Sequence, residues 1–149
     1  SSGLGNHRGS VFRLHVGGAL LDRDDALAPK PATWGAGGKA PSAQAKVDER
    51  HVEAAVSGHI GALPFTWIEA DDEPCKESAR AVIERHSLGL LSAAIATGLE
   101  APSASWLGRH CRHEVVRRCG LWNVKCVDGE YDPAFLDRFE ALANGEGWT

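Results

Sequence analysis

Hydrophobic residues along the chain recur mostly with the spacing of a helix. Apolar positions three and four apart, together with residues that can cap helix ends, predict five helices. They span residues 11–21, 47–57, 77–96, 111–119 and 133–143. The third is the longest, about 30 Å at 1.5 Å per residue, so we expect it to organise the core.

Two other segments have strand character. Residues 63–69 place Leu63, Phe65 and Trp67 at every second position, between Gly61 and a turn at residues 71–74. Residues 121–127 can also be extended. The predicted fold class is α+β, with a small sheet packed by a long central helix and several short helices.

Residues 22–45 are rich in Ala, Pro and Gly and have hardly any apolar period, which predicts a flexible loop. A chain of 149 residues fits one domain and can bury about 68–70% of the surface that its unfolded form exposes. We therefore expect residues 1–149 to form a single domain. No internal repeat is visible.

Composition narrows the class of protein. The chain has no methionine, not even at position 1, so we expect a fragment or a processed product. No apolar run approaches the roughly 18 residues that cross a bilayer, and no signal peptide is visible, which predicts a soluble chain without membrane contact. Four cysteines in a domain of this size are more typical of reduced thiols than of a disulfide scaffold. These features predict a cytoplasmic protein.

Charge is unevenly distributed along the chain. The net charge of −4 argues against a protein that coats nucleic acid over its whole surface. An acidic cluster is formed by Glu69, Asp71, Asp72, Glu73 and Glu77. A basic segment contains Arg109, Arg112, Arg117, Arg118 and Lys125. The basic segment is a candidate nucleic-acid-binding surface.

Histidines and cysteines suggest two further kinds of chemistry. Zinc-binding residue types occur at His110, Cys111, His113, Cys119 and Cys126, but their spacing matches neither a CxxC pair nor a zinc finger. Cys111 and its flanking histidines could form a nucleophile pair, although no family signature surrounds them. The alternative to both is a basic exposed helix with thiols in the core.

Glu84 stands among the core-like residues Val82, Ile83 and Leu88 of the predicted central helix. A carboxylate near the buried side of a helix must be paired, protonated or bound to a cation. From these residues alone, a surface salt bridge to Arg80 competes with cation binding.

Several segments of the chain resemble a branch of the GIY-YIG nucleases. They are GNHRGSVFRLHVG (5–17), IGALPFTW (60–67), IERHSLGLLS (83–92), SWLG (105–108), GLWNV (120–124) and YDPAFL (131–136). The resemblance implies a metal-dependent DNA endonuclease in which one helical glutamate holds a divalent cation, Mg²⁺ or Mn²⁺, beside the scissile phosphate. Glu84 matches that glutamate and is the predicted catalytic residue and metal ligand.

The chain also departs from the family pattern. It has no GIY or YIG motif, and its single tyrosine, Tyr131, lies far downstream. The helix with the family's arginine is expected before Ser1, and Ala93 stands where this branch would show an asparagine. We therefore expect a C-terminal portion of the domain that is inactive or weakened by itself, and an enzyme only if the N-terminal part is supplied.

Two interpretations of the basic residues follow. His7, Arg8, Arg13 and His15 are predicted to bind phosphate, because cationic donors are expected on the side of the missing helix; the alternative is a solvated terminus. For the whole chain, the rival to a nuclease is a non-catalytic module that uses the basic 109–125 region to bind nucleic acid or an acidic partner.

Overall fold

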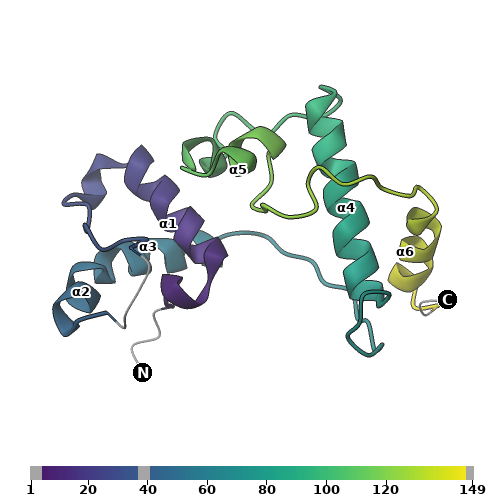
Figure 1. The fold of residues 1–149 in the computed structure, drawn as a ribbon, viewed down its shortest axis with the longest axis horizontal. Helices are drawn as coiled ribbons and strands as arrows, with labels where there is room; N and C mark the ends of the chain where they lie inside the picture. The colour runs from purple at the N-terminus through teal and green to yellow at the C-terminus, as the bar shows by residue number, and fades with distance from the viewer. Residues whose placement is uncertain (1–4, 37–40, 147–149) are drawn as a thin grey trace. The chain divides into compact units, whose positions relative to one another are not determined.

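The computed structural model describes residues 5–36 and 41–146, and every regular element in them is helical (Figure 1). The α-helices are α1 (Val11–Arg23), α2 (Ala43–Asp48), α3 (Arg50–Gly61), α4 (Ala79–Ala96), α5 (Glu114–Cys119) and α6 (Phe135–Ala143). Three short 3₁₀ helices are η1 (His7–Gly9), η2 (Asp25–Leu27) and η3 (Leu107–His110). The prediction of an α+β fold with a small sheet is wrong, because the described residues form no strand.

The missing sheet has a physical cause. A strand is stable only when a neighbouring strand pairs with its backbone N–H and C=O groups. Residues 64–71 have no regular secondary structure, and within the described residues none of their backbone groups bonds to other backbone. The second candidate, residues 121–127, bends through turns and contains Cys126 with a φ of 60°. Neither segment therefore offers the other an extended backbone with which to form the hydrogen bonds of a sheet.

The five predicted helices are confirmed, although their ends differ by a few residues. Ser10 begins α1 as predicted, because its Oγ accepts a hydrogen bond from the N–H of Arg13 at 3.3 Å. Helix α3 continues past Gly58 to Gly61. Gly98 and Gly120 follow α4 and α5 with φ values of 75° and 69°, the left-handed conformation in which glycine commonly ends a helix.

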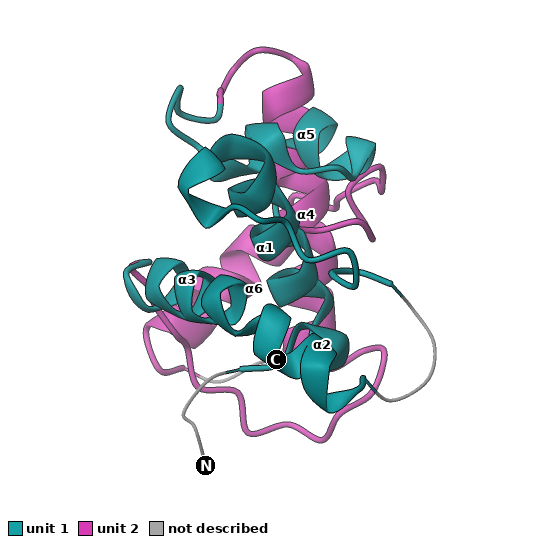
Figure 2. Cartoon of the chain, turned by 90° about the vertical axis from the view of Figure 1, so that its left-hand side faces the viewer, with its two compact units in different colours: residues 1–63, 102–122 teal, residues 64–101, 123–149 magenta. Residues whose placement is uncertain are grey.

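The chain divides into two compact units, coloured teal and magenta in Figure 2. Unit 1 comprises residues 1–63 and 102–122, and unit 2 comprises residues 64–101 and 123–149. Unit 1 has the larger core, in which α1 packs against α3 and η3. The largest side chains at its centre are fully buried, and they include Val16 and Leu21 of α1, Val52 and Val56 of α3, and Val116 of α5.

Residues 22–36 and 41–45, the described part of the predicted flexible loop, contain more regular structure than the sequence predicts. Residues 37–40 of that loop lie outside the described residues. The described part contains η2 and the first residues of α2. Trp34 is buried against α1, where its Nε1 donates to the carbonyl of Leu14 at 3.3 Å. Gly17 makes room for this indole, since a Cβ at position 17 would lie 2.0 Å from Cζ2 of Trp34.

Unit 2 is built on α4 and has a smaller core. The segment before α6 passes close to α4 at Gly89, where a Cβ would lie 2.7 Å from the carbonyl oxygen of Gly129. His86 of α4 accepts a hydrogen bond from the N–H of Asp132 at 3.0 Å, and its ring stacks on Phe135. Phe135 is buried and attaches α6 to the unit.

Across the described residues, no helix is both long and apolar enough to cross a bilayer.

Candidate functional site

Glu84 lies in the middle of α4 and is exposed. The helix begins at Ser78, whose Oγ accepts the N–H of Ala81 at 3.3 Å. Val82 and Gly89 are buried in unit 2, whereas the carboxylate of Glu84 faces solvent. The glutamate is therefore accessible, rather than near the buried side of the helix as the sequence suggests.

The carboxylate of Glu84 forms none of the ion pairs found among the described residues. Arg80, its expected partner, instead donates to the backbone carbonyl of Asp72 at 2.9 Å. The same residues contain no group of three or more His, Cys, Asp or Glu that could hold a metal ion. A single free carboxylate suits a cation such as Mg²⁺, which often takes one or two carboxylates and completes its shell with water and phosphate oxygens.

Three of the four predicted phosphate ligands contact two glutamates of the α2–α3 region. Glu53 accepts a hydrogen bond from the backbone N–H of His7 at 2.6 Å, and Nδ1 of His7 lies 2.9 Å from the same oxygen. Arg13 donates to the other oxygen of Glu53 at 2.7 Å, and Arg8 donates to Glu49 at 2.7 Å. Glu49 and Glu53 are only 2% and 7% exposed. The structure thus brings these three side chains together around two buried carboxylates.

These contacts keep both carboxylates charged. The hydrogen bond from Arg8 lowers the pKa of Glu49. Burial alone would raise the pKa of Glu53, but hydrogen bonds from Arg13 and His7 outweigh burial and lower it. The charges of Arg8 and Arg13 are therefore largely neutralised within unit 1, and their binding of phosphate stays a prediction.

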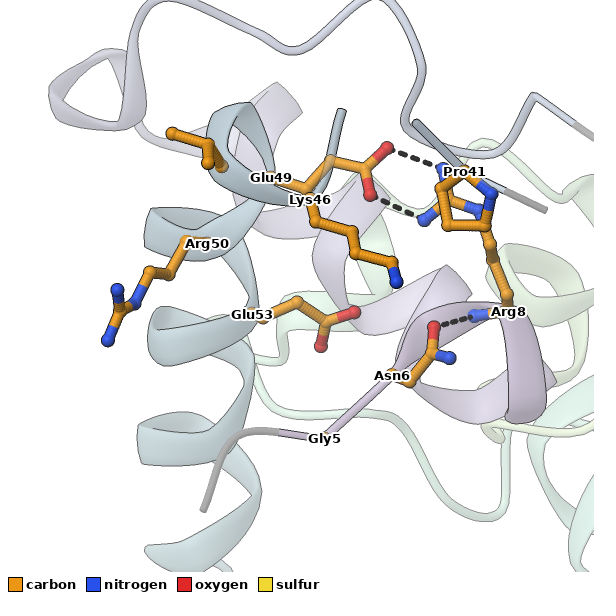
Figure 3. A pocket seen from close by; sticks show the side chains of 9 residues that line it. Gly5, Asn6, Arg8, Pro41, Lys46, Glu49, Arg50 and Glu53 are labelled. Carbon is orange, nitrogen blue, oxygen red and sulfur yellow. Dashed lines mark hydrogen bonds and ion pairs between the residues drawn. The ribbon is translucent and has the colours of Figure 1, made fainter. Parts of the chain in front are cut away.

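A pocket of about 380 Å³ opens beside this network. Figure 3 shows the amino group of Lys46 pointing into the pocket, Arg50 turned away from it, and Arg8 held by Glu49. Lys46 takes part in none of the ion pairs formed by the described residues. Arg50 also lines the pocket without an ion pair among the described residues, but Lys46 is the one of these two whose charged group points into the pocket.

The two histidines of the predicted phosphate site have different surroundings. The ring of His7 stacks on Trp34 at 3.9 Å, and its Nε2 is buried with no partner among the described residues. The ring of His15 meets that of His113 edge-on at 5.3 Å. Burial, and then the charge of His113, lower the pKa of His15, so it adds little positive charge at neutral pH.

The four arginines of residues 109–118 differ in how their charge is balanced. Arg112 binds both carboxylate oxygens of Asp22, at 2.7 and 2.8 Å. Arg109 and Arg117 instead donate to backbone carbonyls, which orient a guanidinium without cancelling its charge. Arg118 is exposed on α5. Arg109 and Arg117 are therefore better placed than Arg112 to attract a phosphate.

The units carry opposite net charges. Unit 1 contains 11 Lys and Arg against 7 Asp and Glu, a net charge of +4, whereas unit 2 contains 5 against 13, a net charge of −8. The predicted arginines all lie in unit 1, and Glu84 lies in unit 2.

The cysteines do not form the alternative sites. All four are free thiols, Cys111 and Cys119 are buried, and Cys126 is exposed. Burial raises the pKa of Cys111, which suits an inert core thiol rather than a nucleophile. The zinc alternative also lacks support, since no three potential ligands converge in the described part of the chain.

The buried positions of Glu49 and Glu53 were not predicted from the sequence. A usable signal was present, because Ala45, Glu49, Val52 and Val56 follow one another at intervals of four, three and four, and all are buried. A charged residue within such a series indicates a buried carboxylate that needs cationic partners.

A family model described as GIY-YIG domain matches residues 1–147, a span that includes both the arginines of unit 1 and Glu84. The chain therefore belongs to the GIY-YIG family, a family of nuclease type. The resemblance found in the sequence is confirmed. No curated protein and no solved structure matches the chain.

Proposed function

We propose that the chain supplies the metal-binding helix of an enzyme that hydrolyses phosphodiester bonds in DNA, that Glu84 is its ligand for Mg²⁺ or Mn²⁺, and that its activity is weak unless the N-terminal part of the domain is supplied. The observation that carries this proposal is the family match over residues 1–147. Within that span, the resemblance of residues 83–92 to the family makes Glu84 the candidate for its metal-binding glutamate. The exposure of Glu84 and its lack of an ion pair within the described residues agree with this role.

A divalent cation, when bound, would offset the charge that develops on the phosphate during attack. Glu84 would hold the cation from the rigid face of an 18-residue helix. Arg109 and Arg117 of unit 1 would contact backbone phosphates, since their guanidinium charge is not neutralised by the carbonyls that they bind. The attacking oxygen has no assigned base, because the chain lacks GIY and YIG motifs.

Nicking of supercoiled plasmid in Mg²⁺ or Mn²⁺ tests the proposal, with residues 1–149 and with a version extended upstream of Ser1. We expect slow cleavage by the former and faster cleavage by the latter. Glu84→Gln should lower either rate about 100-fold or more, since even indirect partners of a metal contribute about 10- to 100-fold. Glu77→Gln, an exposed glutamate just before α4, is the matched control and should keep the full rate. Equal cleavage by both variants would exclude Glu84 as the ligand.

A second candidate function is binding without cleavage by the basic region of unit 1. The net charge of +4 on this unit favours it. DNA binding that weakens with salt, and that falls in Arg109→Ala and Arg117→Ala but less in Arg112→Ala, would support a phosphate-binding surface. If such binding occurs while the extended protein shows no cation-dependent nicking, the binding module is the correct interpretation.

A further inference from the structure

Residues 64–71 of unit 2 expose a run of backbone groups without partners. Neither their N–H nor their C=O groups bond to any group in the described chain, and the segment has no regular secondary structure. Its sequence nevertheless has the alternating pattern of a strand. Such a segment is a ready template for pairing with another extended chain.

The same segment exposes large apolar side chains. Phe65 is 87% exposed and Trp67 is 75% exposed. Apolar side chains that gather on a surface, with polar residues at the rim, commonly mark an interaction site. The unpaired backbone and the exposed aromatics therefore coincide.

A groove of about 550 Å³ lies beside the segment. Its apolar walls come from Trp67 and Ile68 and from Leu142 and Ala143 at the end of α6. Its acidic side is formed by Glu69, Asp71 and Asp72. The groove can thus take an aliphatic side chain and a cationic one next to each other.

Asp72 adds a specific requirement. Its Oδ2 accepts a hydrogen bond from the N–H of Ala79 at the start of α4, but its Oδ1 is buried and has no partner in the described chain. A buried acceptor without a donor is unfavourable, so a side-chain movement at the groove that brings Oδ1 to a donor of a bound peptide would be favourable.

Charge selects the class of partner. The net charge of −8 on unit 2 disfavours nucleic acid at this groove. Lysine or arginine side chains are the complementary groups.

We propose that residues 64–72 and the adjoining groove bind an extended peptide of a partner protein in which apolar residues alternate with Lys or Arg. The peptide pairs with the backbone of residues 65–71 as an added strand, places apolar side chains against Trp67 and Leu142, and donates to Asp72 from a cationic side chain. A peptide of about eight residues can pair along the whole of residues 65–71, because both strands rise by about 3.3 Å per residue. This inference does not depend on nuclease activity.

Fluorescence anisotropy with a labelled peptide of about ten residues that alternates lysine and valine tests the proposal. We expect saturable binding to residues 1–149. The variant Trp67→Ala and the double variant Glu69→Lys with Asp71→Lys should each bind the peptide at least about tenfold more weakly than the unsubstituted chain. The double variant Glu100→Lys with Glu130→Lys is the charge-matched control, since both residues are exposed in unit 2 and neither lines the groove. Hydrogen exchange should show protection of the amides of residues 65–71 by the peptide.

Three outcomes would overturn the proposal. Equal loss of binding in the two double-lysine variants would show general attraction to acidic unit 2. Equal binding of a peptide that alternates glutamate and valine would remove the role of charge. Self-association of the chain that Trp67→Ala abolishes, without peptide binding, would identify a second copy as the occupant instead.

Discussion

The two units of this protein differ in their net charge and in whether they bury charged side chains. Unit 1 has a net charge of +4 and buries Glu49 and Glu53 among cations within a large apolar core. Unit 2 has a net charge of −8 and a small core, and Ser78 and Ser92 are the polar residues of its described part that are buried as a whole. The overall charge of −4 conceals this division. A surface for phosphate and a surface for a cationic ligand can therefore coexist in one chain.

The largest effect should follow from removing a buried charge of unit 1. Glu53→Gln leaves the guanidinium of Arg13 without its carboxylate, and we expect the free energy of unfolding of unit 1 to fall by about 3 kcal/mol. Amide hydrogen exchange of α3 at increasing denaturant concentrations measures this free energy. Glu114→Gln, an exposed glutamate of the same unit, should change the free energy by less than about 0.5 kcal/mol. Equal effects would mean that burial of charge does not distinguish unit 1.

Two adjacent glycines of α1 should respond with opposite signs. Gly17→Ala would drive Cβ into the indole of Trp34 and should destabilise unit 1 by about 2 kcal/mol. Gly18 has no atom within 4 Å of an added Cβ, so Gly18→Ala should stabilise α1 by about 0.5–1 kcal/mol. Thermal unfolding of the two variants side by side measures the contrast. A Gly17→Ala variant as stable as Gly18→Ala would contradict the packing of Trp34 on α1.

Acid should destabilise unit 1. The pKa values of His15 and His59 are lowered mainly by burial, and those of Glu49 and Glu53 are lowered by the contacts described above. Groups with lowered pKa values bind more protons when unfolded, so stability is lost as pH falls, from about pH 6.5 for the histidines and from about pH 5 for the glutamates. Unfolding free energies of unit 1 measured by amide exchange between pH 7 and pH 4 test this. Glu49→Gln should flatten the decline below pH 5, and an unchanged slope would contradict the assignment.

The smallest effect should come from the exposed pair of Arg112 and Asp22. Their side chains are 58% and 28% exposed, so water and salt screen the attraction. Arg112→Ala should lower the stability of unit 1 by about 0.5 kcal/mol, and less in high salt. Urea titrations at low and high salt provide the measurement. A loss comparable with that of Glu53→Gln would mean that exposed and buried pairs contribute alike.

The helices could be predicted from the sequence because their signals are local. Ser10 and Gly120 cap α1 and α5 as expected, and the apolar spacing of α4 located the longest helix. The sheet could not be predicted correctly from the same kind of signal. The alternation of apolar and other residues at 63–69 indicates a segment that can pair as a strand. Pairing requires a second strand, and the described residues do not supply one.

The candidate site residues came from a resemblance to a family more than from local chemistry. Glu84 was predicted from the residues around it and its role stays a prediction, while its exposure could not be inferred from neighbours such as Val82 and Ile83. His7, Arg8 and Arg13 were predicted together as phosphate ligands, but their contacts to Glu49 and Glu53, which span 40 residues or more of chain, were not predicted. Such long-range pairing depends on how α1 packs on α3, which no local pattern specifies.

Binding of Mn²⁺ to Glu84 is the most direct test of the proposed role of α4. In amide NMR spectra, substoichiometric Mn²⁺ broadens the signals of residues close to the bound ion. The account predicts broadening centred on residues 81–88 that disappears in Glu84→Gln and persists in Glu77→Gln. Broadening centred on Glu69, Asp71 and Asp72, unchanged by Glu84→Gln, would contradict it.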